Sequence, residues 1–219
     1  MYKRQILKNN KRSIKLTKKL VHEWLGNEKV DYGKKEKKDQ VGTVTGLAYT
    51  SFGGDILQIE ATRFTGKGRL VLTGQLGDVM KESASIALDY VRTHANEFKI
   101  DPKLFEENDV HIHVPEGAVP KDGPSAGVTM TTALVSCFSN IPVKANLAMT
   151  GEVTLRGNVL PIGGLKEKSL AAHRSGIDTI LIPKENVKDL DDIPQEVKDA
   201  VTFIPCSNVS QVLHNALVK

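Results

Sequence analysis

Residues Val119 to Ser136 read VPKDGPSAGVTMTTALVS, a polar loop rich in chain breakers that leads directly into an apolar run. Pro120, Gly123 and Pro124 stand within five residues, and the VTMTTALV run that follows has the apolar spacing of a buried helix starting near Pro124. Ser125 is therefore expected at a helix N-terminus. Free backbone N–H groups and the positive end of the helix dipole would stabilise an alkoxide or a tetrahedral oxyanion there.

A serine in the first turn of a helix is commonly no more than a cap. Here glycines flank the Pro-Ser-Ala core, at Gly123 and Gly127. Glycine lets another backbone approach closely, at a cost in stability that a simple cap does not require. This arrangement favours Ser125 as a nucleophile, and a serine nucleophile needs a base.

The candidate base lies in PIGGLKEKSLAAHRSG, Pro161 to Gly176, where a glycine pair opens a second predicted helix and Gly176 closes it. Lys166 and Lys168 both fall in its first turn. Helical spacing separates them, because Lys168 shares a face with Leu165 and Ala172, whereas Lys166 shares one with more polar residues. Lys168 is therefore the better candidate for burial.

A lysine acts as a base near neutral pH only if its pKa falls about three units from about 10.4, which corresponds to roughly 4 kcal/mol. A helix N-terminus disfavours the ammonium by at most about 2 kcal/mol. Burial against apolar and small residues would have to supply the rest. Two solvated surface lysines remain the alternative interpretation of this segment.

These segments together resemble a known family. The chain from about Asp39 to Lys219 is similar to the proteolytic domain of the Lon family of ATP-dependent proteases, with PKDGPSAG, LAMTGEVTLRGNVLPIGGLKEK and AAHRSG in the family's order and spacing. The resemblance implies a catalytic dyad of Ser125 as nucleophile and Lys168, forty-three residues later, as general base. It also implies that the Thr150 hydroxyl lies beside the dyad lysine.

Further residues are expected to support the site. Backbone N–H groups around Asp122 to Ser125 would form an oxyanion hole. Glu60 interrupts an apolar and β-branched strand, so it lies on the solvent face or, as the resemblance suggests, points into the site. His113, which precedes the serine loop, is expected to support the site or to be a packed histidine. The proposed chemistry requires no cofactor and no metal in this chain.

A zinc site is a separate hypothesis for the strand DVHIHV, Asp109 to Val114. His111 and His113 project to the same face, because strands repeat every two residues, and two such histidines could ligate zinc. No carboxylate or cysteine follows at a helical spacing that would complete the site. Metal binding is therefore not predicted.

Bulk properties are those of an ordinary globular chain of 219 residues, one large domain or one plus a small piece. No run approaches 18 apolar residues and the N-terminus lacks the apolar core of a signal peptide, so neither membrane insertion nor secretion is expected. Cys137 and Cys206 fit no metal or redox spacing and are predicted to be reduced, buried thiols. The predicted location is cytoplasmic.

Residues 1–38 carry 13 Lys and Arg against 4 acidic residues, a net +9, which leaves −5 for the remainder of a chain whose total is +4. A basic end can contact nucleic acid, but a solvated helix face is the commoner meaning, and no aromatic residues are interleaved for base stacking. The segment holds an amphipathic helix ending at Gly26, with Ile14, Leu16, Leu20, Val21, Trp24 and Leu25 on its apolar face.

The position of that helix resembles the tail of the small helical subdomain in the Lon ATPase module, with GKKEKKDQ as a linker to the protease domain at 39–219. The chain has no G-x-x-x-x-G-K-[ST] loop, so it is not expected to bind ATP in the usual way. ATP and Mg are implied only for an ATPase module outside this chain. The chain is interpreted as a fragment of a longer protein.

The predicted fold class is α+β, with a mixed sheet and helices in two layers. Residues 41–73 read as a β-meander, Gly77 to Glu97 as a long amphipathic helix, and Asn146 to Pro161 as two short strands joined at Arg156-Gly157-Asn158. Then βα units continue to a terminal helix, Asn208 to Leu217. The resemblance implies a fold related to a ribosomal small-subunit protein domain and to small-molecule kinases.

That kinship supplies a rival function, in which DGPSAG would cradle nucleotide phosphates at a helix N-terminus. The loop has fewer glycines than such a cradle needs. A catalytically dead assembly domain is the third reading, against which the presence of both dyad residues counts. The function predicted here is an endopeptidase. The resemblance further implies unfolded protein substrates fed by an ATPase ring, and a homo-hexameric assembly.

Overall fold

The computed structural model describes residues 15–26, 38–50, 53–115 and 120–218, and the chain divides into two compact units, Met1–Tyr32 and Gly33–Lys219. In the smaller unit, α2 (Lys18–Leu25) is capped by the Thr17 side chain, which accepts the N–H of Leu20. Gly26, with φ 79°, ends the helix as predicted. No side chain of α2 is buried. Ile14 and most of the expected linker lie outside the described residues.

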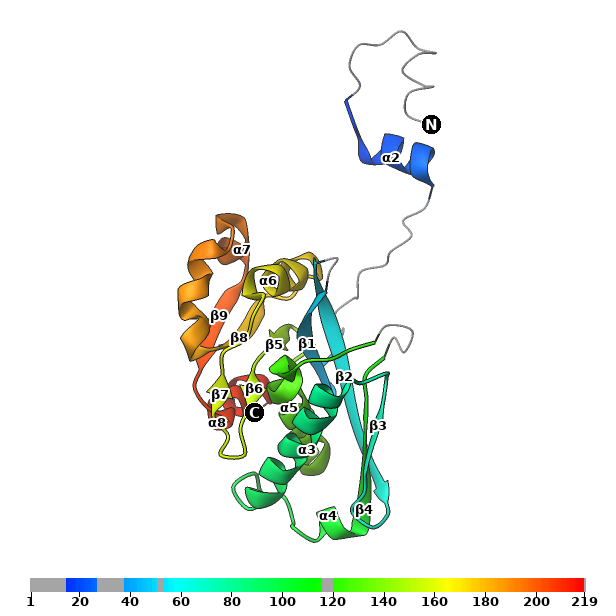
Figure 1. The fold of residues 1–219 in the computed structure, drawn as a ribbon, viewed down its shortest axis with the longest axis vertical. Helices are drawn as coiled ribbons and strands as arrows, with labels where there is room; N and C mark the ends of the chain where they lie inside the picture. Colours follow the sequence, from blue (N-terminus) through cyan, green and yellow to red (C-terminus); the bar gives the residue numbers. More distant parts are fainter. Residues whose placement is uncertain (1–14, 27–37, 51–52, 116–119, 219) are drawn as a thin grey trace. The chain divides into compact units, whose positions relative to one another are not determined.

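The larger unit is built on a seven-stranded sheet with the strand order β3-β4-β2-β1-β5-β8-β9 and a separate β6–β7 hairpin (Figure 1). Its strands are β1 (Thr43–Thr50), β2 (Gly53–Thr65), β3 (Leu70–Thr73), β4 (Asn108–His113), β5 (Leu147–Met149), β6 (Glu152–Val153), β7 (Val159–Leu160), β8 (Thr179–Pro183) and β9 (Thr202–Cys206). Its helices are α3 (Asp78–Thr93), α4 (Leu104–Glu107), η1 (Pro124–Ala126), α5 (Gly127–Ser139), α6 (Leu165–Arg174), η2 (Lys184–Asp192), α7 (Gln195–Ala200) and α8 (Val209–Ala216).

The sheet is mixed, which confirms the predicted α+β class. β1 pairs antiparallel with β2, and β2 with β4, whereas β1–β5, β5–β8, β8–β9 and β3–β4 are parallel pairs. The βα units therefore extend one side of an N-terminal hairpin. The predicted hairpin at Arg156-Gly157-Asn158 forms as β6–β7, with Gly157 at φ 77°.

The predicted meander is wrong in its third strand, because β4 lies between β2 and β3. The segment joining β2 to β3 makes no tight hairpin turn. It wraps around the carboxylate of Asp109 at the start of β4, which accepts the backbone N–H of Lys67 at 2.7 Å and of Arg69 at 3.0 Å. This contact ties the β2–β3 connection to the start of β4, which pairs with β2 and β3 on its two sides.

Helices pack against both faces of the sheet, so the layering exceeds the two layers expected. In β1, Val44 belongs to a core cluster that includes residues of α3, α5 and α8. Leu47 lies three positions later and therefore on the opposite face of the sheet. It belongs to a second cluster, which includes residues of α6 and α7. α5 is buried over nearly its whole length. Two of its threonines satisfy their hydroxyls within the helix, Thr131 on the Gly127 carbonyl and Thr132 on the Val128 carbonyl.

The two cysteines are free and buried, as predicted. Burial raises the pKa of both thiols, Cys137 and Cys206, to about 11, so neither is a reactive thiolate near neutral pH. Within the ranges that the structure describes, none of the helices has both the length and the apolar character needed to span a lipid bilayer.

The Asp109 carboxylate is the strongest polar anchor of the β2–β3 connection. Besides the two backbone N–H groups it accepts the Nε–H of Arg69 at 2.9 Å and forms an ion pair with Nη2 of the same guanidinium at 2.7 Å. The N–H of Lys67, then those of Arg69, hold the pKa of Asp109 at about 2, below its ordinary 3.8. The charged form of the Asp109 carboxylate therefore stabilises the fold.

We expect Asp109→Asn to lower the Tm by several degrees at pH 7, because the amide cannot accept all of these hydrogen bonds. Since the folded-state pKa of Asp109 lies below the unfolded one, this stability is present above about pH 3.8 and is lost as the pH falls through about 2. Thermal unfolding between pH 2 and 7 measures this. The control is Asp78→Asn, which breaks only an exposed pair with Lys81; an equal loss there would contradict the assignment.

Candidate active site

The serine loop enters α5 through the single 3-10 turn η1, whose first residue is Pro124. The predicted helix start near Pro124 is thus confirmed, with its first turn wound more tightly than an α-helix. Ser125 is half-buried in this turn. Its backbone carbonyl accepts the N–H of Gly151 at 2.9 Å, which ties the loop to the segment after β5.

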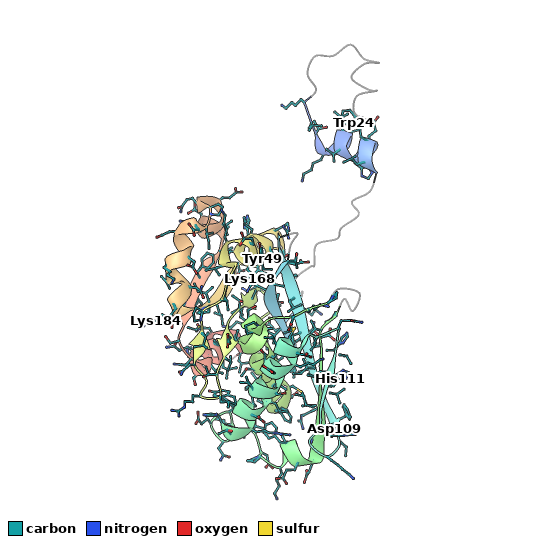
Figure 2. All side chains as sticks on the ribbon, viewed as in Figure 1. Trp24, Tyr49, Asp109, His111, Lys168 and Lys184 are labelled. Carbon is teal, nitrogen blue, oxygen red and sulfur yellow. The ribbon has the colours of Figure 1, made fainter. Side chains whose placement is uncertain are left out.

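Helix α6 buries one of the two candidate lysines. Lys168 is 3% exposed, whereas Lys166 is exposed. The prediction from helical faces, that Lys168 and not Lys166 is buried, is confirmed. Leu165 and Ala172, on the same face as Lys168, are also buried. Figure 2 shows Lys168 on α6, away from the end of the sheet where Asp109 lies.

Three predicted site residues are brought together around the Thr150 hydroxyl. Lys168 Nζ donates to Thr150 Oγ1 at 3.1 Å, and Thr150 Oγ1 donates to the Ser125 backbone oxygen at 3.5 Å. In the part of the chain that the structure describes, no hydrogen bond joins the Ser125 hydroxyl to Lys168. Thr150 thus holds the Lys168 amine beside the backbone of Ser125, and the side chains of Ser125 and Lys168 are not hydrogen-bonded to each other.

Burial lowers the pKa of Lys168 from its ordinary 10.5 to about 8. Desolvation is the cause, because taking the ammonium out of water disfavours the charged form. With that pKa about a tenth of the amine is neutral at pH 7, and half at pH 8. The lysine is therefore close to the range in which it can accept a proton.

Asp122 anchors the serine loop to α3. Its Oδ1 accepts the N–H of Met80 at 3.0 Å, in the first turn of α3, and the N–H of Gly123 at 2.9 Å. The neighbouring carbonyl of Lys121 accepts the N–H of Gly77, the N-cap residue of α3, at 2.7 Å. A side chain at Gly77 would meet the Asp122 carboxyl carbon at 2.3 Å, so the two segments touch without intervening space.

This anchoring bears on the predicted oxyanion hole. The Gly123 N–H is occupied by the Asp122 carboxylate, and Pro124 has no N–H to give. The backbone N–H groups of Asp122 and Ser125 therefore remain as the candidate oxyanion donors of this stretch.

Glu60, in β2, and His113, in β4, lie on the same face of the sheet. They are cross-strand partners in the β2–β4 pair; Glu60 is exposed and His113 partly so. Among the described residues, no hydrogen bond or ion pair links either side chain to Ser125, Thr150 or Lys168. Their supporting role stays a prediction that rests on the resemblance.

His111 and His113 do share one face, and both reach the Thr73 hydroxyl, at 2.8 Å from Nε2 and 2.6 Å from Nδ1. One hydroxyl proton can serve only one of the two rings, so the other ring must donate its N–H. Over the described part of the chain, no three His, Cys, Asp or Glu side chains gather closely enough to hold a metal ion.

Gly151 has a position in the site that the sequence did not single out. Its N–H is donated to the Ser125 carbonyl, and its own carbonyl accepts the N–H of Val128 in the first turn of α5. A side chain there would meet Val159 at 2.8 Å and Val128 at 3.0 Å. A glycine directly after Thr150 was the available signal, because a Cβ at this position would press against two valine side chains.

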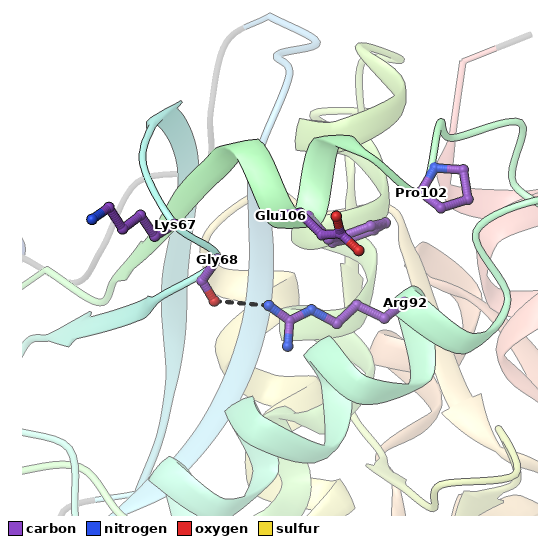
Figure 3. Close-up of a pocket in the computed structure, with 6 residues that line it drawn as sticks. Lys67, Gly68, Arg92, Pro102 and Glu106 are labelled. Carbon is purple, nitrogen blue, oxygen red and sulfur yellow. Dashed lines mark hydrogen bonds between the residues drawn. The ribbon is translucent and has the colours of Figure 1, made fainter.

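A cavity of about 550 Å³ lies elsewhere, lined by Lys67, Gly68, Arg92, Pro102, Phe105 and Glu106 (Figure 3). Arg92 donates from Nη2 to the Gly68 carbonyl at 2.8 Å, and its guanidinium lies 6.0 Å from the centre of the Phe105 ring. The 13-residue β2 runs from beside α6 to beside this cavity, a length on the order of 40 Å. The cavity is therefore separate from the lysine site.

Comparison with known proteins assigns the family. The family model described as the Lon protease (S16) C-terminal proteolytic domain matches residues 15–219. The chain is 58% identical over 214 residues to a Lon protease of Brevibacillus choshinensis, covering 98% of this chain and 28% of the relative. It is 56% identical over 215 residues to Lon protease 1 of Myxococcus xanthus, covering 98% and 26%. The chain thus spans about a quarter of the length of the curated relatives it matches.

Proposed function

Because this chain belongs to the Lon protease family, as its proteolytic domain, we propose that it is a serine endopeptidase that uses Ser125 and Lys168 as a catalytic dyad. The observation that carries the proposal is the buried Lys168 amine, held by Thr150 at the backbone of Ser125. Burying an ammonium costs several kcal/mol when no acid pairs with it. A perturbed lysine of this kind, beside a candidate nucleophile, marks a functional site.

In the proposed mechanism, neutral Lys168 takes the Ser125 hydroxyl proton as the serine oxygen attacks a peptide carbonyl. The amine then returns the proton to the leaving nitrogen, and water hydrolyses the acyl-enzyme by the same route. The Thr150 hydroxyl orients the amine. The amides of Asp122 and Ser125 would stabilise the oxyanion, at about 3 to 4 kcal/mol for a good donor. The Ser125 hydroxyl must first meet Nζ, since apo sites are commonly looser than reacting ones.

The wider setting is proposed from the family. Its substrates would be unfolded or damaged proteins delivered by an ATP-driven unfoldase in the same polypeptide, with ATP and Mg bound by that module and not by this chain. Residues 1–38 would be the tail of that module's small helical subdomain and a linker, with 39–219 as the protease domain. The assembled protein would be a homo-hexamer in the cytoplasm.

Reaction with a fluorophosphonate tests the proposed nucleophile. We expect the 219-residue chain to gain one adduct on Ser125, with a rate that rises with pH through about 8 as the Lys168 amine becomes neutral. Peptide mapping by mass spectrometry between pH 6 and 10 locates the adduct. Ser169, buried one residue from the lysine, serves as an internal control and should stay unlabelled. A phosphate-binding loop or a dead assembly domain would leave Ser125 unlabelled at every pH.

A further inference from the structure

The end of the β1–β2 hairpin packs directly against the backbone of the lysine helix. A side chain added at Gly54, the second residue of β2, would place its Cβ 2.0 Å from the carbonyl oxygen of Glu167 and 2.9 Å from the backbone nitrogen of Lys168. Gly54 has no left-handed φ, unlike its neighbour Gly53 at φ 115°. The reason for a glycine at position 54 is therefore the close approach to α6, not the backbone conformation.

Two more contacts hold the same hairpin end against α6. Arg174, the last residue of the helix, donates from Nη2 to the Gly54 carbonyl at 3.0 Å. Tyr49, the cross-strand partner of Gly54, packs on Gly164, where the Cβ of any side chain would lie 3.1 Å from the ring. The hairpin therefore touches α6 at its N-cap and at the peptide bond that leads into Lys168.

These contacts fix how α6 sits over the sheet. Lys168 reaches Thr150, which follows β5 on the far side of β1, so the 3.1 Å contact depends on where the helix backbone lies. The exclusion of water from the amine depends on the same placement, because Lys168 is on the face of α6 that is packed and not on its exposed face. Moving the helix would loosen both.

We propose that Gly54 is a positioning residue for Lys168. Because Gly54 has no side chain, α6 packs directly against the β1–β2 hairpin, and this packing sets the location of the Lys168 amine and excludes water from it. The inference rests on the proposed function for its effect on turnover. Its effect on the amine itself does not depend on catalysis. Nothing in the GGD turn pattern of the sequence distinguishes this role from that of an ordinary turn glycine.

Gly54→Ala is the direct test in the 219-residue chain. A Cβ needs about 3 Å from the Glu167 oxygen, so the helix and the hairpin must separate by about 1 Å. A displacement of that size costs on the order of 100-fold in rate. We expect kcat on an unstructured peptide to fall by that factor with a smaller change in KM. We also expect the titration midpoint of Lys168, followed by NMR of its ¹³Cε, to rise from about 8 towards 10.5.

Gly66→Ala is the matched control, just beyond the other end of β2. It too has no left-handed φ and no room, because its Cβ would lie 2.3 Å from the Asp109 carboxyl group. It should lower the Tm while leaving the Lys168 midpoint at about 8. A shift of the midpoint in Gly66→Ala equal to that in Gly54→Ala would show a general effect of destabilisation and would overturn the proposal.

Arg174→Met gives a milder second variant, which removes the donor to the Gly54 carbonyl without a clash. If Gly54→Ala does not fold, by circular dichroism, this variant decides: a raised midpoint supports the proposal and an unchanged one overturns it. A folded Gly54→Ala with an unchanged midpoint overturns it as well. Retained turnover in Lys168→Met would refute the dyad instead, and the NMR titration still tests the positioning because it needs no turnover.

Discussion

Ser125→Ala should lower the rate of peptide hydrolysis by roughly 10⁴-fold or more, as removal of a nucleophile does in other serine hydrolases. The Tm should stay nearly unchanged, because the half-buried hydroxyl makes no hydrogen bond among the described residues. Hydrolysis of an unstructured fluorogenic peptide and a thermal melt measure the two outcomes. The same preparation should show no ATP turnover.

The contrasting control is Ser136→Ala in α5. The Ser136 hydroxyl oxygen accepts the N–H of Gly42, in a buried position far from the lysine. This variant should therefore lose stability by about 1 to 3 kcal/mol and keep its activity per folded molecule. Near-wild-type turnover in Ser125→Ala would remove the serine from the mechanism.

Local patterns in the sequence were sufficient to predict the elements that carry Ser125 and Lys168, the proposed dyad. Apolar residues three and four apart placed Lys168 on the packed face of its helix and Lys166 on the outer one, and burial follows that division. The breakers before Ser125 predicted where the next helix begins. Both are properties of a few consecutive residues, which a period of 3.6 captures.

The order of the strands in the sheet could not be predicted from such local patterns. β4 lies between β2 and β3 through strand pairing and through Asp109, which accepts backbone N–H groups some forty residues earlier in the chain. The anchor between Asp122 and Met80 spans 42 residues, and that between Arg174 and Gly54 spans 120. Contacts of this kind are set by how the elements pack, and no spacing within a segment encodes them.

The same limit applies to the residues that were expected to support the site, because their hydrogen bonds also depend on packing between segments. Thr150 was carried over from the family's motif, and its hydroxyl does contact both Lys168 and the Ser125 backbone. Asp122 lies in the expected loop, yet its carboxylate occupies an amide that the oxyanion hole was expected to use. A motif fixes which residues are near each other and leaves open which hydrogen bonds they make.

Lys168→Met should abolish turnover and, at neutral pH, stabilise the fold. Methionine keeps an apolar stem in the packed face of α6 and removes an ammonium from a site that disfavours it. The folded-state pKa of about 8 against an ordinary 10.5 corresponds to a penalty of about 3 kcal/mol. The lost hydrogen bond to Thr150 offsets about 1 kcal/mol of it. Thermal and urea unfolding measure the gain.

The pH dependence of the stability gain distinguishes removal of the buried ammonium from better packing as its cause. Below pH 8 both folded and unfolded wild type carry the ammonium, and the penalty is complete. Between 8 and 10.5 the unfolded chain binds a proton that the folded one does not, so wild-type stability rises with pH and the advantage of the variant shrinks. Above about 10.5 the penalty is gone, and the variant should be no more stable than the wild type, which keeps the hydrogen bond to Thr150. A constant advantage across this range would assign the gain to packing alone.

Lys166→Met is the matched control in the same helical turn. Its ammonium is exposed, so both turnover and stability should change little at any pH. Wild-type turnover should rise with pH through about 8, since only the neutral Lys168 amine accepts the serine proton. An inactive Lys166→Met beside an active Lys168→Met, or a rate that rises only near pH 10, would show that the base is not Lys168.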